Sequence, residues 1–440
     1  MRLVYLILSY LAAPFFLGFL IWRGFHSRAY WARFGERFGF GGPRLSTPSV
    51  WIHAVSVGEV QAAAALVRAL QIGYPGVPIV MTTMTPTGAQ LVKDLFGDSV
   101  TQRYVPYDLP GAVVRFFDCI KPKLAIVIET EIWPNLFHEC GRRGVPLVLA
   151  SARISPRSVV RYRWVVSLFR EALSHGIVIA AQSDKDAERF RSIGAHPART
   201  HVTGNIKFDF ELSARVKTDG EKFRRDHAPD RPVWVAASTH ENEETQVLDA
   251  FDRLRKRVRD SLLILVPRHP ERFASVGQLL KRRGYTFARR SNGEAPSADT
   301  EVFLVDTLGE LSEFYAAADV AFVGGSLVPV GGHNLLEPAA LGIPSLTGPH
   351  CYNAEDIAEL LIEVGACHII TDPASLAAAL EDYFRNPDRR RRDGERGRKA
   401  VRDNRGTLDR LMALLGPLLA EPPAAKPAAG PDQSTTPTSD

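Results

Sequence analysis

Short runs of β-branched and apolar residues alternate with amphipathic helical stretches along most of this chain, beginning at Val50. The run VWIHAV is followed by EVQAAAALVRALQ, PIVMTTM by TPTGAQLVKDLF, and LAIVIET by IWPNLFHECGRRG. These apolar runs lack alternating polar residues, which indicates strands that are buried on both faces. Buried strands that alternate with helices predict an α/β fold, in which helices cover both sides of a parallel sheet.

The alternation stops once and then resumes, which indicates two domains. Residues 208–232 are charged and lack a strand pattern, and the alternation resumes with VWVAAST and SLLILVP. We therefore predict two doubly wound α/β domains, residues 23–207 and 233–418, joined by a linker at 208–232. Residues 419–440 are rich in Pro, Ala, Ser and Thr, so we expect a disordered tail there.

The N-terminal segment is apolar enough to attach the chain to a membrane. No charged residue occurs between Leu3 and Trp22, and ~20 apolar residues match the hydrocarbon thickness of a bilayer. We therefore predict a membrane anchor at residues 1–22, with the rest of the chain in the cytoplasm because arginines follow the segment. It either crosses the bilayer or lies in its interface, since Pro14 permits a kink. A buried core helix is an alternative, whereas the apolar run is too long for a signal peptide.

Composition narrows the range of partners. The 54 Lys and Arg against 49 Asp and Glu give a net charge of +5, a mild bias towards anionic ligands such as phosphates or acidic lipid headgroups. No nucleic-acid-binding signature accompanies it, so we expect no nucleic acid partner. The four cysteines form no CxxC or zinc spacing and read as free thiols. The basic run of residues 388–399 is read as a solvated helix face or loop, with lipid headgroup contact as the alternative.

Glu59, in HAVSVGEV, is the only acid between Arg44 and Asp94 and follows the first predicted strand. Together with Ser56 it fits S-x-x-E, a capping box in which the glutamate would serve only the helix start. Two features favour a functional reading. Gly58 permits a ligand to approach the backbone closely, and a carboxylate near a helix N-terminus stays ionised, which suits a general base.

Three other charged residues of the first domain occupy comparable places. Glu129 and Glu131 flank a threonine where the strand LAIVIE ends, and could orient an acceptor or tune a base. Alternatively, they only precede a helix that begins near Pro134. Lys207, in GNIKFD, lies at the domain junction, where it is either solvated surface or a charge that stabilises an anion.

In the second domain, Arg268 follows the strand SLLILVP and could contact a phosphate. Two glycine pairs surround the loop in GGSLVPVGGHNLLEPAALGIP, after which we expect a helix to start at Asn334. The free amides of that start would form an anion site, with Glu337 placed to bind the hydroxyls of a ribose. Asn334 and Glu337 could equally be a cap pair. Neither a Walker loop nor GxGxxG is present, which disfavours kinase-like and dehydrogenase readings.

Seven motifs follow the apolar segment in a fixed order: HAVSVGEV, TTMTPTG, ETEIWPNL, GNIKFD, STHENEE, LVPRHPERF and GGSLVPVGGHNLLEPAALGIP. In this order they resemble the bacterial 3-deoxy-D-manno-octulosonic acid (Kdo) transferases, from the anchor to about Tyr352. The resemblance implies a GT-B glycosyltransferase, with two Rossmann-like domains facing a cleft and CMP-Kdo as donor. The acceptor would be a tetraacylated lipid A precursor (lipid IVA) at the cytoplasmic face of the inner membrane. The reaction would be inverting and would need no metal or cofactor.

The resemblance also implies roles for individual residues. The catalytic base matches Glu59, a second important acid matches Glu129 with Glu131 as the other member of its motif, and the basic residue matches Lys207. Residues 23–207 would form the acceptor domain, and residues 233–418 the donor domain. Contacts to CMP would be made by Pro267, Arg268, Leu308, Gly309, Glu310, Asn334, Leu335, Leu336 and Glu337. Residues after the anchor would meet acyl chains and lipid phosphates, namely Trp31, Phe34, Arg33 and Arg37.

Two other readings remain open. The chain could be a different enzyme on the same scaffold, such as a nucleotide-sugar epimerase or an N-acetylglucosaminyl transferase, which would bind UDP rather than CMP. It could also be a membrane-tethered protein without enzymatic activity, in which Glu59 would only cap its helix.

Overall fold

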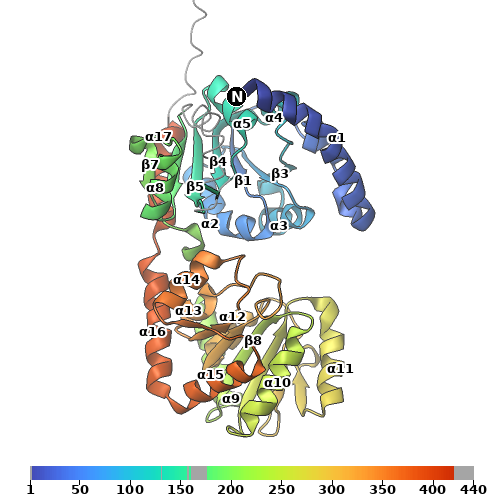
Figure 1. Ribbon diagram of the computed structural model, residues 1–440, viewed down its shortest axis with the longest axis vertical. Coiled ribbons are helices and arrows are strands. Elements are labelled where there is room, and N and C mark those ends of the chain that lie inside the picture. Colours follow the sequence, from blue (N-terminus) through green and yellow to red (C-terminus); the bar gives the residue numbers. More distant parts are fainter. Residues whose placement is uncertain (1, 130, 156–157, 160–175, 421–440) are drawn as a thin grey trace, which may run out of the picture. The chain divides into compact units, whose positions relative to one another are not determined.

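The computed structural model describes residues 2–129, 131–155, 158–159 and 176–420, and it separates into two compact units (Figure 1). The first unit consists of residues Met1–Phe210 and Arg405–Asp440, and the second of Glu211–Asn404. Each unit contains one seven-stranded sheet, and the strand pairs of both sheets are parallel. The predicted α/β fold class is therefore confirmed.

The first sheet has the strand order β3-β2-β1-β4-β5-β6-β7. Its strands are β1 Ser49–His53, β2 Ile79–Thr83, β3 Thr101–Tyr104, β4 Pro122–Ile128, β5 Leu147–Ala152, β6 Val178–Ala181 and β7 Thr200–Val202. Because the order reverses between β1 and β4, the loops after these two strands diverge to opposite faces. Such a switch point is where doubly wound sheets place their ligands.

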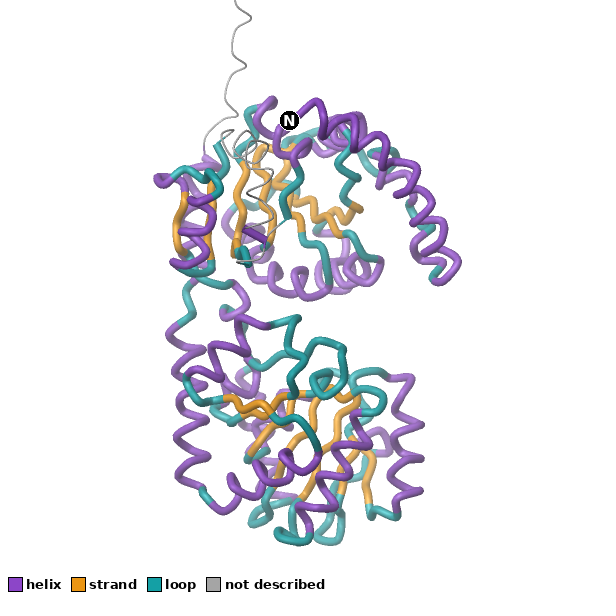
Figure 2. Tube along the Cα trace, viewed as in Figure 1, coloured by secondary structure: helices purple, strands orange, loops and turns teal. Residues whose placement is uncertain are grey.

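Helices cover both faces of this sheet (Figure 2). They are α2 Val57–Gly73, α3 Pro86–Phe96, α4 Pro110–Ile120, α5 Pro134–Arg143, α8 Asp184–Ser192 and α17 Thr407–Ala420. Alternate residues of each strand point to opposite faces: Trp51 packs with Phe116 and Phe137, whereas Ile52 packs with the α2 and α17 side. Burial on both faces explains the continuous apolar runs of the sequence.

The second sheet has the order β10-β11-β9-β8-β12-β13-β14, with its switch point between β8 and β12. Its strands are β8 Val233–Thr239, β9 Leu262–Pro267, β10 Phe287–Arg289, β11 Val302–Leu304, β12 Val320–Val323, β13 Ser345–Thr347 and β14 Cys367–Ile369. Its helices are α9 Ala214–His227, α10 Glu243–Arg255, α11 Phe273–Arg283, α12 Leu311–Ala317, α13 Leu336–Leu341, α14 Glu355–Glu363, α15 Pro373–Arg385 and α16 Pro387–Asp403.

Three strands escaped the sequence analysis, and all three lie at the edge of a sheet. β3 and β7 form the two edges of the first sheet, and β10 forms one edge of the second. They span three or four residues, TQRY, THV and FAR, and carry polar side chains. An edge strand is buried less completely than a central one, so it shows no apolar run.

The unit boundaries differ from the predicted domains at two places. Within the expected linker, α9 packs in the second unit, where Phe223 contacts Phe303 and Phe314. The C-terminal helix α17 belongs to the first unit rather than the second. Asp209 of the GNIKFD motif fixes the start of α17, because its carboxylate accepts the backbone N–H of Gly406 at 2.7 Å and that of Leu408.

The predicted disordered tail is shorter than expected within the described residues. Leu419 and Ala420 belong to α17, and Leu419 is buried. Residues 421–440 lie outside the part of the chain that the structure describes.

The basic run of residues 388–399 forms part of α16, and most of its arginines are paired with acids. Arg389, for example, contacts Asp382 and Asp393, and Arg396 lies 3.3 Å from Asp393. The other face of α16 is buried and contains Gly394 and Gly397. The run is therefore the solvated face of a packed helix, as predicted, and lipid headgroup contact stays an alternative for the same face.

The N-terminal apolar segment forms α1, Arg2–His26, which extends four residues beyond the predicted anchor. Among the described residues, α1 is the one helix long and apolar enough to cross a membrane, with a mean hydropathy of 2.2. The expectation that Arg37 meets lipid phosphates is wrong, because its side chain is buried. Its guanidinium lies 4.2 Å from the ring centroid of Tyr104 and donates to the carbonyl oxygen of Met84 at 2.9 Å.

Candidate active site

Glu59 lies in the first turn of α2, directly after β1, at the switch point of the first sheet. Its Oε2 accepts the backbone N–H of Val55 at 2.7 Å, and its Oε1 lies 3.3 Å from the Ser56 hydroxyl. Ser56 is the N-cap residue, but its side chain accepts no backbone N–H. The capping box is therefore not formed, although Glu59 does hold the turn between β1 and α2.

Glu129 follows β4, the neighbour of β1 across the switch point, and has a left-handed backbone (φ 60°). This conformation is uncommon for a residue with a side chain and is found at functional sites. Lys207 Nζ donates to Glu129 Oε1 at 2.6 Å, and about a quarter of each side chain is exposed. The structure thus brings together two residues that are 78 positions apart in the sequence.

Glu131 completes a group of three carboxylates. Trp133 Nε1 donates to Glu131 Oε2 at 2.9 Å, which holds this side chain just before α5. Glu59, Glu129 and Glu131 line one side of a cavity of about 250 Å³. The remaining lining comes from the segment after β5, namely Arg153, Ile154, Ser155 and Ser158.

Two of the three carboxylates, Glu59 and Glu131, have raised pKa values. Burial raises the pKa of Glu59 to about 7; the Val55 N–H opposes this rise, Glu129 and Glu131 add to it, and Lys207 lowers it. Burial also raises the pKa of Glu131. A carboxylate that is half ionised near neutral pH can accept a proton in one step and release it in the next.

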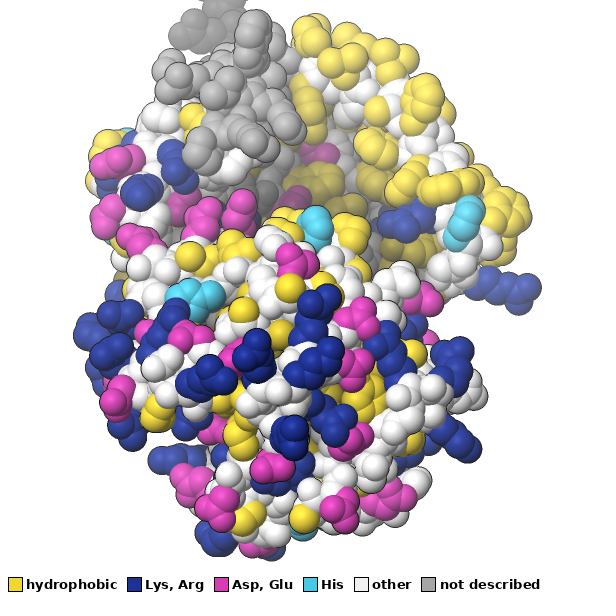
Figure 3. All heavy atoms as spheres, turned by 60° about the horizontal axis from the view of Figure 1, so that its bottom comes forward, with side chains coloured by type: hydrophobic (Ala, Val, Ile, Leu, Met, Phe, Trp, Pro, Cys, Tyr) yellow, Lys and Arg dark blue, Asp and Glu magenta, His cyan; other side chains and the backbone are white. Residues whose placement is uncertain are grey.

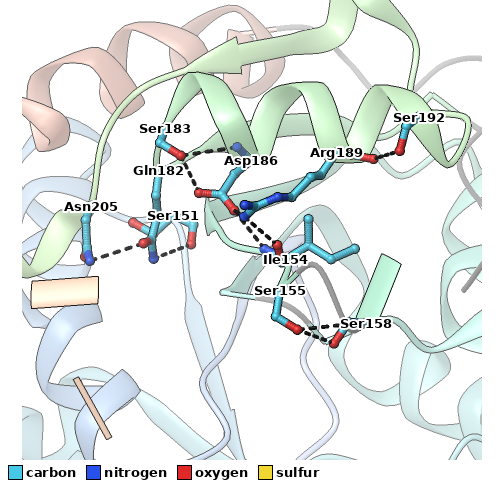
Figure 4. A network of polar contacts seen from close by, with 10 residues as sticks. All are labelled: Ser151, Ile154, Ser155, Ser158, Gln182, Ser183, Asp186, Arg189, Ser192 and Asn205. Carbon is cyan, nitrogen blue, oxygen red and sulfur yellow. Dashed lines mark hydrogen bonds and ion pairs between the residues drawn. The ribbon is translucent and has the colours of Figure 1, made fainter. Parts of the chain in front are cut away.

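The segment after β5 was not identified from the sequence, because neither its charge nor its pattern is unusual. Figure 4 shows how α8 supports it: Asp186 accepts the backbone N–H of Ile154 at 3.1 Å, and Arg189 donates to the Ile154 carbonyl at 3.1 Å. The hydroxyls of Ser155 and Ser158 lie 3.0 Å apart. They add hydroxyl groups to the lining of the cavity, which suit hydrogen bonds to sugar hydroxyls.

A second part of this network supports the loop that carries Lys207 (Figure 4). Asn205 Oδ1 accepts the Lys207 backbone N–H at 3.0 Å, and Asn205 Nδ2 donates to Gln182 Oε1 at 3.3 Å. Ser151, which also has a left-handed backbone (φ 51°), accepts the N–H of Ile206 through its hydroxyl at 3.0 Å. Lys207 is thus held by backbone contacts on one side and by Glu129 on the other.

The predicted CMP contacts all lie in the second unit, at the carboxyl ends of its strands or in the connections that follow them. Pro267 ends β9 and is buried, while Arg268 is exposed. Leu308 and Gly309 are exposed in the loop after β11, and Glu310 accepts a hydrogen bond from Arg290 Nη2 at 2.6 Å. Among the described residues, no hydrogen bond or ion pair joins Arg268 to the loop after β11, so their common role stays a prediction.

The expected helix start at Asn334 is wrong by two residues, since α13 begins at Leu336. Asn334 Oδ1 accepts the N–H of Leu336 at 3.0 Å, and Asn334 Nδ2 donates to Glu337 Oε1 at 2.9 Å. Glu337 Oε2 accepts from the hydroxyl of Ser312 at 2.8 Å. Leu335 and Leu336 are both buried. Asn334 and Glu337 therefore hold each other in place, much as a cap pair would.

Three histidines gather at the same edge of the second sheet, and the sequence analysis assigned none of them a role. His240 follows β8, and its ring stacks on that of His333 with Nε2 atoms 2.8 Å apart. His269 contacts His240 edge-on at 5.0 Å. Burial is the main cause that lowers the pKa of His333 to about 4, and the charges of His240 and Arg268 contribute to it.

The glycine loop after β12 already holds a carboxylate from its own chain. Glu243, at the start of α10, is buried and accepts four backbone N–H groups, those of His240, Gly325, Ser326 and Leu327, at 2.7–3.2 Å. A Cβ at Gly324 would lie 2.6 Å from Glu243 Oε2, which explains a glycine there. The amides of Gly325 to Leu327 therefore hold Glu243 at the switch point of the second sheet. They are not free to bind an external anion at this first glycine pair.

Among the described residues, no group of three or more His, Cys, Asp and Glu side chains is placed to hold a metal ion.

Comparison with known proteins identifies the family of this chain. Residues 32–210 match the family described as 3-deoxy-D-manno-octulosonic-acid transferase (kdotransferase). A 3-deoxy-D-manno-octulosonic acid transferase of Haemophilus influenzae is 42% identical over 421 residues, which cover 95% of this chain and 99% of the relative. The corresponding protein of Bordetella pertussis is 38% identical and covers 90% of this chain and 96% of its own length.

The fold agrees with this assignment. A glycosyltransferase structure from Rickettsia africae superimposes with a TM-score of 0.54 at 12% identity, covering 86% of this chain and all of that one. At this identity the likeness concerns the GT-B-like fold alone. The sequence relatives, which match over nearly their whole length, decide the family: the chain belongs to the 3-deoxy-D-manno-octulosonic acid (Kdo) transferases, a family of glycosyltransferases.

Proposed function

We propose that this enzyme transfers Kdo from CMP-Kdo to a lipid A precursor, lipid IVA, with inversion at the anomeric carbon and with Glu59 as the general base. The reaction takes place at the cytoplasmic face of the inner membrane, as a step of lipopolysaccharide core biosynthesis, and uses no metal or other cofactor. This proposal is finer than the family assignment, which names the transferred sugar but neither the base nor the stereochemistry.

One observation carries the choice of base. Glu59 has a pKa near 7, lines the 250 Å³ cavity, and lies at the switch point where doubly wound sheets bind their ligands. A general base is most effective when its pKa lies close to the working pH, because it is then both available and strong enough. Glu131 also lines the cavity but is held by Trp133, and Glu129 is paired with Lys207.

In the proposed step, a hydroxyl oxygen of the acceptor forms a bond to the anomeric carbon of Kdo. The bond between that carbon and the phosphate oxygen breaks, and CMP leaves with the electron pair. The hydroxyl proton moves to the carboxylate of Glu59. Attack from the face opposite to the leaving group inverts the configuration.

Lys207 and Glu129 belong to the electrostatic surroundings of this base. Burial is the main cause of the raised pKa of Glu59; the charge of Glu129 adds to the rise and that of Lys207 opposes it. Lys207 also brings a positive charge close to the cavity, where negative charge develops during the transfer. Ser155 and Ser158, which also line the cavity, are suited to bind acceptor hydroxyls.

The donor is assigned to the second unit, where the nine predicted CMP contacts lie. Arg268 is an exposed cation at a strand end, the place and chemistry expected for a phosphate contact. Asn334 and Glu337 offer polar atoms to the ribose beside it, although both already hydrogen bond within the chain. A nucleoside monophosphate donor needs to have only one phosphate neutralised, which an arginine can do.

The test is Kdo transfer from CMP-Kdo, generated in situ, to lipid IVA by wild type, Glu59→Gln and Glu188→Gln. Glu188 is an exposed glutamate of α8, so its change is a matched control. We expect the first variant to fold, to bind CMP and to lose roughly 10²–10⁴-fold in kcat, while the control keeps full activity. An active Glu59→Gln enzyme would refute the base, and a wild type that binds UDP-sugars but not CMP would refute the donor.

A further inference from the structure

The apolar helix α1 contacts the first unit at several points between Tyr5 and Leu20. Tyr5, near its start, donates through its hydroxyl to Asp108 Oδ2 at 2.7 Å. The ring of Phe16 stacks on that of Tyr107 with 4.8 Å between centroids, and Leu20 is 1% exposed. Tyr5 and Leu20 are 15 residues apart, so at ~1.5 Å per residue these contacts extend over roughly 22 Å.

The opposite face of α1 is apolar and exposed. Only 6% of its most apolar 18-residue window is buried, and the helix contains no acidic residue. Figure 3 shows the apolar surface that results. Its large exposed side chains are Leu3, Val4, Ile7, Leu8, Tyr10, Leu11, Phe15, Leu17, Phe19, Ile21, Trp22 and Phe25. A continuous apolar face of this length, ending beside Arg23 and Arg28, suits a lipid surface with anionic headgroups.

A helix that crossed the bilayer could not keep these contacts. The hydrocarbon layer is ~30 Å thick, so a crossing α1 would carry Tyr5 to the far side of the membrane. Asp108 would stay with the sheet, between β3 and α4, and would lose the Tyr5 hydroxyl. Both faces of α1 are used if the helix lies parallel to the membrane plane, with one face towards lipid and the other on the protein.

Asp108 connects this attachment to the catalytic pocket. Its carboxylate also accepts the backbone N–H groups of Asn135 and Leu136, each at 2.9 Å, and so fixes the first turn of α5. That turn directly follows Trp133, which holds the cavity carboxylate Glu131. Asp108 is 7% exposed and therefore well protected from water.

We propose that α1 is a monotopic anchor that lies in the plane of the membrane, and that Asp108 is a positioning residue that joins this anchor to the loop carrying Glu131. The inference deepens the proposed function, since it says how the enzyme is held at the surface where a lipid acceptor resides. The in-plane orientation of α1 is a statement about membrane topology alone, so its test does not depend on the reaction.

Topology is tested with the full chain in spheroplasts, using a maleimide that does not cross membranes. Arg2→Cys reports the start of α1, and Ser46→Cys, at an exposed position of the first unit, is the matched cytoplasmic control. The unaltered chain gives the background from its native cysteines. We expect both variants to be labelled only after the spheroplasts are permeabilised. Labelling of Arg2→Cys in intact spheroplasts, with Ser46→Cys protected, would overturn the in-plane anchor.

The role of Asp108 is tested by removing single hydroxyls from α1. Tyr5→Phe loses the bond to Asp108 but keeps its apolar ring, and Tyr10→Phe removes an exposed hydroxyl from the same helix as the control. In detergent-free membranes that contain lipid IVA, we expect Tyr5→Phe to lower kcat roughly three- to tenfold with the KM for CMP-Kdo unchanged, because fewer pockets are in the productive geometry. Equal kcat values for the two variants would overturn the positioning role. An inactive wild type would instead refute the proposed function.

Discussion

Ionised Glu59 should destabilise the folded first unit, and its replacement by glutamine should relieve that cost. The carboxylate is largely buried, and its pKa is raised from 4.5 to about 7. Between these two values the folded state binds more protons than the unfolded state, so stability falls as the pH rises through this window. Above pH 7 the whole cost is present, whereas below pH 4.5 none of it is.

The magnitude follows from the size of the pKa difference. A difference of 2.5 units corresponds to about 3.4 kcal/mol at ~1.36 kcal/mol per unit, of which about 2.5 kcal/mol develops between pH 5 and pH 8. Because the side chain keeps partial contact with solvent, screening reduces this to about 2 kcal/mol. Glutamine keeps an acceptor for the Val55 N–H and carries no charge at either pH. We therefore expect the free energy of unfolding of Glu59→Gln, relative to that of wild type, to increase by about 2 kcal/mol between pH 5 and pH 8.

The assay is urea denaturation at pH 5, 6, 7 and 8, followed by tryptophan fluorescence. Trp234 is the only tryptophan of the second unit, so a Trp234→Phe background makes the signal specific for the first unit. Glu188→Gln in the same background is the control and should follow wild type at every pH. If the stability difference between Glu59→Gln and wild type does not change with pH, the reasoning about its burial and ionisation is refuted.

Two further predictions concern buried carboxylates that hold loops. Glu243→Gln replaces two acceptor oxygens by one, so at least two of its four backbone N–H partners lose their acceptor. We expect the free energy of unfolding, measured by urea denaturation, to fall by about 2–4 kcal/mol. The control Glu359→Gln changes an exposed residue and should cost almost nothing; equal losses in the two variants would contradict the role given to Glu243. Asp186→Asn weakens the hydrogen bond that supports Ile154 in the cavity wall. We expect a higher KM for lipid IVA, with CMP binding unchanged in calorimetry. An unaltered KM would show that this wall does not bind the acceptor.

The central strands could be predicted because burial on both faces requires continuous apolar runs, and this signal is local. The three missed strands are edges, where only a few residues pair and the outer side faces away from the sheet. The placement of α17 in the first unit could not be predicted either, since it depends on Asp209, which lies about 200 residues earlier in the chain. Tertiary contacts of this kind leave no periodic trace.

Some residues of the candidate site could likewise be predicted from a local pattern, and others could not. Glu59 and Glu129 stood out because each charge interrupts an apolar pattern at the end of a strand. The ion pair between Glu129 and Lys207 could not be predicted, because these residues are 78 positions apart and meet only in the folded chain. The polar wall around Ser155 carried no signal, because serines after a strand are common in loops. The burial of Arg37 was hidden by its position in a series of arginines that resembled a membrane-facing cluster.

The most direct test of the central claim is the pH dependence of kcat/KM for Kdo transfer, which reports the ionisation of the free enzyme's base. We expect kcat/KM of wild type to decrease as the pH falls below about 7, the pKa of Glu59. This decrease is the acidic limb of the pH profile. Glu131→Gln removes a negative charge near the base and should move this limb to lower pH. Lys207→Gln removes a positive charge and should move it to higher pH, while Glu188→Gln should leave it in place. A limb that stays at the same pH in all these variants would contradict Glu59 as the base.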